Sequence, residues 1–200
     1  MEDIILIGGA PTVGKSYLGK KLAEELKLPW ISTDTIREMM RKVVTDEKRF
    51  PHLLHATRYT AEQYLTTFTP EQIVRHQIEE SCDTWQGVRA LIQTDYVWKS
   101  FIVEGVGILP ELVHKDFSES KSVKPIFLVT ENKDRIREVV FKRGLWDNAD
   151  KYPDSLKDIE VEWAYQFSKW LHGEAKKYGY PVYEVKDLDF PIEEIKRLIN

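Results

Sequence analysis

The chain has 200 residues and carries 29 basic and 33 acidic side chains, which gives a net charge of −4 at pH 7. This length fits one α/β domain with a small insertion. The acidic balance argues against broad binding to nucleic acid or to a membrane surface, and no apolar run approaches membrane-spanning length. The single cysteine, Cys82, excludes an intramolecular disulfide and a multi-cysteine metal site. We expect it to be a small core residue on a helix, in a cytoplasmic protein.

Residues 9–16, with the sequence GAPTVGKS, fit the phosphate-binding pattern G-x-x-x-x-G-K-[ST]. The apolar run before this loop predicts a buried strand, and leucines at every fourth position after it predict an amphipathic helix. A chance match in a glycine-rich turn is the alternative, and the flanking segments argue against it. We expect Gly9 and Gly14 to adopt backbone angles that a Cβ atom would forbid, so that amide groups surround a phosphate. Lys15 would reach the β- and γ-phosphates, and the Ser16 hydroxyl would ligate Mg²⁺.

A second short strand is predicted at residues 28–33, and Asp34 opens the helix that follows. Arg37 and Arg41 lie three and seven positions after Asp34, so the three side chains share one helical face. This group predicts an acceptor site, because open α/β sheets bind ligands at the carboxyl ends of their strands. Asp34 would orient or deprotonate the acceptor hydroxyl, and the two arginines would hold an anionic group. The alternative is a helix cap, formed by Thr33 or Asp34, with two exposed arginines.

Two segments, GGAPTVGKS at residues 8–16 and ISTDTIRE at residues 31–38, resemble the 2-phosphoglycerate kinase-like branch of the P-loop small-molecule kinases. The wider group includes nucleoside monophosphate, gluconate and shikimate kinases and chloramphenicol phosphotransferase. The resemblance implies a P-loop NTPase fold, with a five-stranded parallel sheet of order 2-3-1-4-5 and helices on both faces. It also implies that Asp34 faces the acceptor hydroxyl and that Arg37 binds the acceptor's phosphate, with ATP and Mg²⁺ as cofactors.

Residues 45–99 are predicted to form a helical region, which takes the place of the acceptor-binding lobe in the resembled family. Its strongest signal is the helix start at Thr69 and Pro70, from which the apolar spacing predicts a helix to about Trp98. No two histidines have the spacing of a metal pair, and scattered surface histidines are the favoured interpretation for most of them. The candidates to face the acceptor in this region are His52, His55, Arg58, His76 and Arg89.

Three further strands are predicted at residues 101–105, 124–129 and 181–185, which brings the total to five. Glu104 is expected either to hold a Mg²⁺-bound water or to contact the acceptor, with a structural role as the alternative. The glycines that follow it, at positions 105 and 107, predict a turn or a close backbone approach. Further helices are predicted from Pro110, across Arg135 to Arg143, from about Asp154 to Gly179, and from about Pro191.

The segment at residues 143–154 is predicted to be a lid that closes over the nucleotide and excludes water. In the resembled kinases, one arginine near the lid packs on the adenine and another reaches the transferring phosphate. Arg143 occupies the later of these two places, whereas Val139 occupies the earlier one. Arg135 or Arg137 is therefore an alternative source of charge, and a solvated basic helix end is the other interpretation.

The sequence predicts ATP-dependent phosphoryl transfer to a small, anionic or phosphorylated metabolite, with an acceptor like 2-phosphoglycerate favoured. The alternatives are a nucleotide or nucleoside kinase, an ATPase or switch module, and an RNA or polynucleotide kinase. The predicted catalytic residues are Lys15, Asp34 and Arg143. The predicted nucleotide-binding residues are Gly9, Ala10, Pro11, Thr12, Val13, Gly14, Lys15, Ser16, Tyr17 and Arg143. The predicted acceptor-binding residues are Asp34, Arg37, Arg41 and Glu104, and the predicted metal ligands are Ser16 and Glu104.

Overall fold

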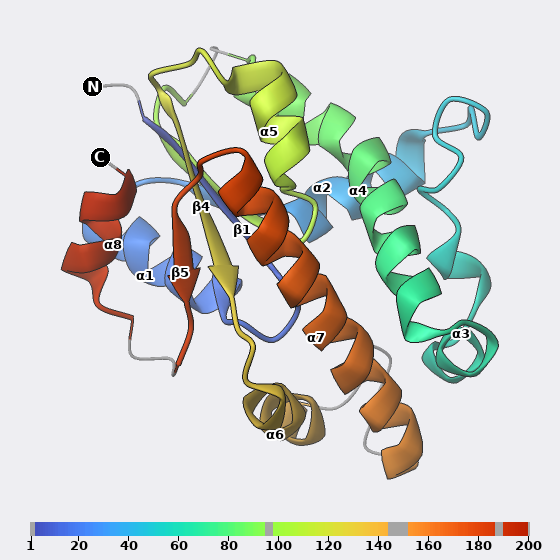
Figure 1. The fold of residues 1–200 in the computed structure, drawn as a ribbon. Helices are drawn as coiled ribbons and strands as arrows, with labels where there is room; N and C mark the ends of the chain where they lie inside the picture. The colour runs from blue at the N-terminus through green and yellow to red at the C-terminus, as the bar shows by residue number, and fades with distance from the viewer. Residues whose placement is uncertain (1–2, 95–97, 144–151, 187–189, 200) are drawn as a thin grey trace.

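The computed structural model describes residues 3–94, 98–143, 152–186 and 190–199. Its centre is a parallel five-stranded sheet with the order β2-β3-β1-β4-β5, as predicted (Figure 1). The strands are β1 (Ile4–Gly9), β2 (Trp30–Ser32), β3 (Phe101–Gly105), β4 (Val123–Val129) and β5 (Val182–Glu184). Strands β1 and β3 are buried along their whole length, which explains the apolar runs that begin them; Glu104 of β3 is the buried exception.

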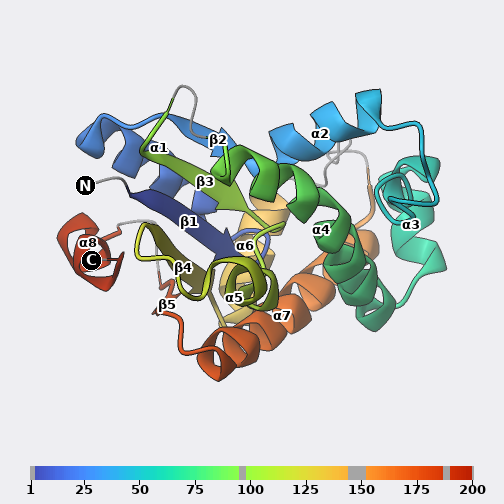
Figure 2. The ribbon, with the colours of Figure 1, turned by 90° about the horizontal axis from the view of Figure 1, so that it is seen from above.

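Helices cover both faces of the sheet (Figures 1 and 2). One face is covered by α1 (Lys15–Leu26) and α8 (Ile192–Ile199), which are joined by an ion pair between Lys196 and Glu25 at 2.8 Å. The other face is covered by α5 (Pro110–Phe117) and by the long helix α7 (Asp154–Lys177), against which α6 (Lys133–Arg143) packs. The register places Ile7 of β1 beside Glu104 of β3, so the loops after these two strands emerge at the same edge.

The chain between β2 and β3 forms a helical lobe, which we define as residues 33–92. It contains α2 (Thr33–Val43), the short 3₁₀ turn η1 (Ala56–Arg58), α3 (Ala61–Thr67) and α4 (Pro70–Ile92). Figure 2 shows that this lobe lies beyond the carboxyl ends of the strands. Both α3 and α4 start at a capping box, in which a threonine hydroxyl accepts from the third residue of the helix and that glutamine's side chain accepts in return.

Several local predictions in the lobe need correction. Helix α4 ends at Ile92 rather than near Trp98, because the apolar positions that indicated it also end at Ile92. Helix α2 is capped by Ser32, whose hydroxyl accepts from the Asp34 amide at 3.2 Å, and not by Thr33 or Asp34. Cys82 lies on α4 as predicted, but it is exposed. Its neighbours Ser81 and Asp83 are buried instead.

Most of the predicted lid, residues 143–154, lies outside the described residues, as does the side chain of Arg143. The lid and the role of Arg143 therefore stay predictions. Of the helices that the structure does describe, none combines the length and the apolar character needed to cross a bilayer.

Candidate functional site

The loop between β1 and α1 has the backbone shape that the motif predicts, with one difference. Gly14 has a φ of +90° and Thr12 a φ of +71°, and α1 begins directly at Lys15. The expectation of an unusual backbone angle at Gly9 is wrong, because Gly9 is the last residue of the extended strand β1. Its glycine is required by close packing instead, since a Cβ atom there would lie 2.8 Å from the carbonyl oxygen of Leu128.

Three predicted residues meet at the base of this loop. The Lys15 ammonium donates to the carbonyl of Ala10 at 2.7 Å and is only 9% exposed. Ser16 Oγ donates to Glu104 Oε1 at 3.1 Å, and Glu104 is 1% exposed. Burial raises the pKa of Glu104, while Lys15 and hydrogen bonds from Ser32 and Ser16 act in the opposite direction. A hydroxyl and a carboxylate side by side are the oxygen ligands that Mg²⁺ prefers.

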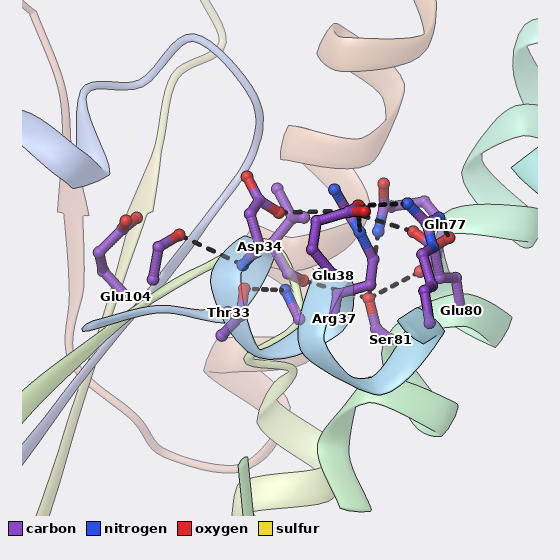
Figure 3. Close-up of polar contacts among 12 residues, drawn as sticks. Thr33, Asp34, Arg37, Glu38, Gln77, Glu80, Ser81 and Glu104 are labelled. Carbon is purple, nitrogen blue, oxygen red and sulfur yellow. Dashed lines mark hydrogen bonds and ion pairs between the residues drawn. The ribbon is translucent and has the colours of Figure 1, made fainter. Parts of the chain in front are cut away.

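Asp34 and Arg37 lie next to each other at the start of α2 (Figure 3). Arg37 Nη1 is 3.1 Å from Asp34 Oδ1 and 3.4 Å from Glu80 Oε2 of α4. The Asp34 side chain is exposed, whereas that of Arg37 is 21% exposed. The pair therefore presents a carboxylate and part of a guanidinium group at the carboxyl edge of the sheet, which is the arrangement that the helical spacing predicts.

Arg41 is held more tightly than the sequence suggests. Its Nη1 lies 2.6 Å from Glu38, its Nη2 contacts Glu80, and its Nε donates to the carbonyl of Leu53 at 2.9 Å. With a side chain only 11% exposed, it joins α2 to α4 and to the loop before η1. The interpretation of Arg37 and Arg41 as exposed helix arginines is therefore wrong. Glu80, which the sequence analysis did not single out, lies between them, and burial raises its pKa despite the two guanidinium groups.

A cavity of about 670 Å³ connects the phosphate loop to the helical lobe. This volume is within the usual range for small-molecule sites. On the loop side it is lined by Pro11, Thr12, Gly14, Lys15, Ser16, Tyr17 and Glu104. On the lobe side it is lined by Asp34, Arg37, Arg41, His52, His55, Tyr59, Tyr64, His76 and Glu80, among others. Gly9, Ala10 and Val13 of the predicted nucleotide-binding set do not line it.

The histidines of the lobe are gathered in this cavity, which corrects their interpretation as scattered surface residues. His52, His55 and His76 all line it, and the rings of His55 and His76 are 4.4 Å apart. The Tyr64 hydroxyl lies 3.0 Å from His76 Nδ1, and burial raises the pKa of Tyr64. Within the described ranges, no group of three His, Cys, Asp or Glu side chains is arranged to hold a metal ion.

The two arginine candidates of the lobe lie away from the cavity. Arg58 pairs with Glu47 at 3.1 Å, and Arg89 pairs with Asp116 at 3.6 Å. Neither belongs to the cavity lining. The Arg58–Glu47 pair is exposed on both sides and contributes little stability, whereas Asp116 in the second pair is mostly buried.

The arginines of α6 have different surroundings. Arg135 Nη1 donates to the carbonyl of Thr12 in the phosphate loop at 3.4 Å. Arg137 instead pairs with Asp158 of α7 and lies 4.1 Å from the centre of the Phe141 ring. Of these two alternatives, Arg135 is therefore the one next to the nucleotide site.

The buried polar atoms of the cavity-lining residues include two that make no hydrogen bond with any part of the chain that the structure describes. They are Thr12 Oγ1, in the phosphate loop, and Trp163 Nε1, on α7. Buried donors normally have partners, and unpaired ones cost free energy. Both atoms are buried, so neither is exposed to the cavity in this structure.

Comparison with known proteins extends this picture. Residues 4–173 match the model of the Cytidylate kinase-like family. Two relatives named 2-phosphoglycerate kinase, from Methanothermobacter thermautotrophicus and Methanocaldococcus jannaschii, are 31% and 30% identical over 96% and 98% of this chain. In each case the match covers 63% of the relative, so this chain spans less than two thirds of their length.

Solved structures show the same fold. The shikimate kinase of Bacteroides thetaiotaomicron has a TM-score of 0.52 and 16% identity, and the match covers 98% of this chain and 95% of that one. The shikimate kinase of Acinetobacter baumannii has a TM-score of 0.54 and 14% identity over 100% of this chain and 93% of that one. At such identities the likeness concerns the fold alone. The match over residues 4–173, most of the chain, shows that the chain belongs to the Cytidylate kinase-like family, and the solved structures show that it has the fold of a P-loop kinase.

Proposed function

We propose that the protein transfers the γ-phosphoryl group of ATP to a small phosphorylated hydroxy acid, with 2-phosphoglycerate as the favoured acceptor. The observation that carries this proposal is that the phosphate loop, Asp34 and Arg37 all line one cavity. The archaeal relatives named 2-phosphoglycerate kinase support the choice of acceptor.

The chain's own residues supply mainly positioning and charge neutralisation, because the loose transition state of phosphoryl transfer requires little covalent chemistry from the protein. The loop amides and Lys15 hold the triphosphate. The exposed Asp34 carboxylate accepts a hydrogen bond from the acceptor hydroxyl and directs its oxygen toward the γ-phosphorus. Arg37 holds an anionic group of the acceptor beside it, and the helical lobe forms the wall that selects the acceptor.

Ser16 and Glu104 fit a magnesium ion, since both offer oxygen atoms and lie 3.1 Å apart beside Lys15. When bound, the ion neutralises charge that develops on the β- and γ-phosphates. Arg135 is the described arginine that can assist from α6, and Arg143 is expected to do so from the lid. The single cysteine favours a cytoplasmic setting, and the net charge of −4 favours small-molecule partners over nucleic acid.

A nucleoside monophosphate is the second candidate acceptor. The rings of Tyr59 and Tyr64 line the cavity, and aromatic side chains offer stacking surfaces for a base. The name of the matching family points in the same direction.

The test is a scan of phosphorylated hydroxy acids, plain hydroxy acids, nucleosides and nucleoside monophosphates for acceptor-dependent ADP release. We expect 2-phosphoglycerate to stimulate release, Lys15→Ala to abolish it, and Asp34→Asn to bind ATP but lose about 10²- to 10⁴-fold in transfer. Comparable transfer by Asp34→Asn would remove Asp34 from the mechanism. Slow hydrolysis that no acceptor stimulates would favour an ATPase or switch module, and RNA binding with a steep salt dependence would favour a polynucleotide kinase.

A further inference from the structure

The arginine pair of the acceptor site is already matched by the protein's own acids. Arg37 lies 3.1 Å from Asp34 and 3.4 Å from Glu80, and Arg41 pairs with Glu38 and Glu80. Two guanidinium groups therefore face three carboxylates. An acceptor with two anionic groups would increase a local excess of negative charge, so its binding requires a further source of positive charge in the cavity.

The loop that carries the nearest candidates is held in a defined position on α4. Asp83, a buried residue of α4, accepts hydrogen bonds from the backbone amides of His52 at 2.7 Å and Leu53 at 3.0 Å. Arg41 binds the Leu53 carbonyl from the other side, and the His55 amide donates to the carbonyl of His52 at 3.1 Å. These hydrogen bonds hold the backbone from which His52 and His55 project.

His55 and His76 form a pair on the lobe wall of the cavity. Their rings meet edge to face with centres 4.4 Å apart. The Tyr64 hydroxyl bonds His76 Nδ1 at 3.0 Å, and the Phe68 ring packs against both imidazoles, 5.5 Å from His55 and 4.7 Å from His76. Because the Tyr64 hydroxyl contacts Nδ1 of His76, the other ring nitrogen of His76 is Nε2. Both histidines line the cavity.

The groups that surround His76 favour its neutral form while the cavity holds no anion. Burial and the neighbouring His55 lower the pKa of His76, because both disfavour a positive charge at this position. Glu79 acts in the opposite direction. The charged and titratable groups that act on His76 are His52 and His55 from the loop before α3, Tyr64 from α3, and Arg75 and Glu79 from α4.

We propose that His55 and His76 form a second anion-binding subsite of the acceptor cavity, which takes up one proton as it binds. The subsite receives the acidic group of the acceptor that Arg37 does not hold. This inference rests on the proposed function and narrows its substrate class to small acids with two anionic groups, such as a phosphate and a carboxylate. A neutral sugar or a plain hydroxy monoacid engages only part of the site.

The first test measures KM for 2-phosphoglycerate between pH 6 and pH 8.5 at saturating ATP. The variant His76→Asn retains a partner for Tyr64, and His114→Asn, at an exposed histidine of α5, is the matched control. Because the acceptor's phosphate also titrates near pH 6, the informative quantity is the ratio of KM between variant and wild type. We expect His76→Asn to raise KM about tenfold at pH 6 and little at pH 8.5, with kcat nearly unchanged. A ratio that does not vary with pH would overturn the proposal.

The second test follows the imidazole NMR signals during titration with 2-phosphoglycerate and, separately, with inorganic phosphate. We expect saturation to raise the pKa of His55 or His76 while His114 stays unchanged. If 2-phosphoglycerate is not a substrate but either anion raises these pKa values, the proposed acceptor is wrong and the subsite stands. If neither anion moves the two signals, the subsite does not exist, whatever the turnover.

Discussion

Replacement of Glu80 tests how the acceptor site is assembled. The side chain is 10% exposed and lies between Arg37, at 3.4 Å, and Arg41. Removal of one partner of a buried ion pair typically costs about 3–5 kcal/mol, because the other charge remains buried. Here each arginine retains a second acid, Asp34 at 3.1 Å or Glu38 at 2.6 Å, so we expect a smaller loss for Glu80→Ala, about 2–3 kcal/mol.

Glu80→Gln should behave differently. The amide oxygen can still accept a hydrogen bond from Arg41, and burial already raises the pKa of Glu80, which means that the ionised form gains little from folding. We therefore expect a loss within about 1 kcal/mol of unfolding free energy. In thermal unfolding, each kcal/mol corresponds to about 2–4 °C for a chain of this size. The alanine variant should melt about 4–12 °C lower than the wild type, and the glutamine variant within about 4 °C of it.

The same variant should bind an anionic acceptor more tightly. Two anions on opposite edges of one guanidinium group are about 6 Å apart, and their repulsion is about 0.7–3 kcal/mol for an effective dielectric constant between 80 and 20. Steady-state kinetics of Glu80→Gln should therefore show KM for 2-phosphoglycerate lowered by about tenfold, with KM for ATP unchanged. An increase in the acceptor's KM would mean that Glu80 itself contacts the acceptor, and would refute this account of the site's charge.

Three further changes test other parts of the structure. Burial raises the pKa of Glu104, so the stability that this group contributes is complete below its pKa in the unfolded chain and is lost as pH rises through its pKa in the folded protein. In thermal unfolding, the Tm of Glu104→Gln relative to the wild type should therefore be higher at pH 8 than at pH 4. A Tm difference that is the same at both pH values would contradict this. Gly105→Ala should lose at least about 2 kcal/mol in denaturant unfolding, since φ is +152° and a Cβ would lie 1.8 Å from Thr33 Oγ1. Arg135→Ala should raise KM for ATP, because Arg135 contacts the phosphate loop. Arg137→Ala, which removes an exposed ion pair, should have the KM of the wild type. Equal changes in KM for the two variants would show that contact with the phosphate loop does not determine ATP binding.

The position and most of the backbone shape of the phosphate loop could be predicted from the sequence because the signals are local. Residues 9–16 carry the loop motif within eight consecutive positions, the strand before them is a continuous apolar run, and an amphipathic helix follows. The place of Asp34 followed from its position directly after a strand. The strand order came from the family resemblance, since periodicity does not reveal which strands are neighbours.

The acceptor side could not be predicted in the same way, because its residues meet only through packing of separate helices. Glu80 is an ordinary acid in the sequence, and its role appears only where α4 crosses α2 beside Arg37 and Arg41. His55 and His76 are 21 positions apart, and no spacing rule connects them. One missed element did carry a local signal: the Thr60 to Gln63 capping box marks the start of α3 just as the corresponding box at Thr69 marks α4.

The two walls of the cavity come from different stretches of the chain, and this division has an evolutionary consequence. The phosphate loop lies between β1 and α1, and Val139 of α6 and Trp163 of α7 also line the cavity, whereas the acceptor side is inserted as one continuous segment between β2 and β3. Under the proposed function, exchange of that segment for another would change the acceptor and leave the phosphate loop intact. Arg41 and its partners Glu80 and Leu53 all lie inside that segment, so the contacts that hold α2, α4 and the loop before η1 together would be transferred with it.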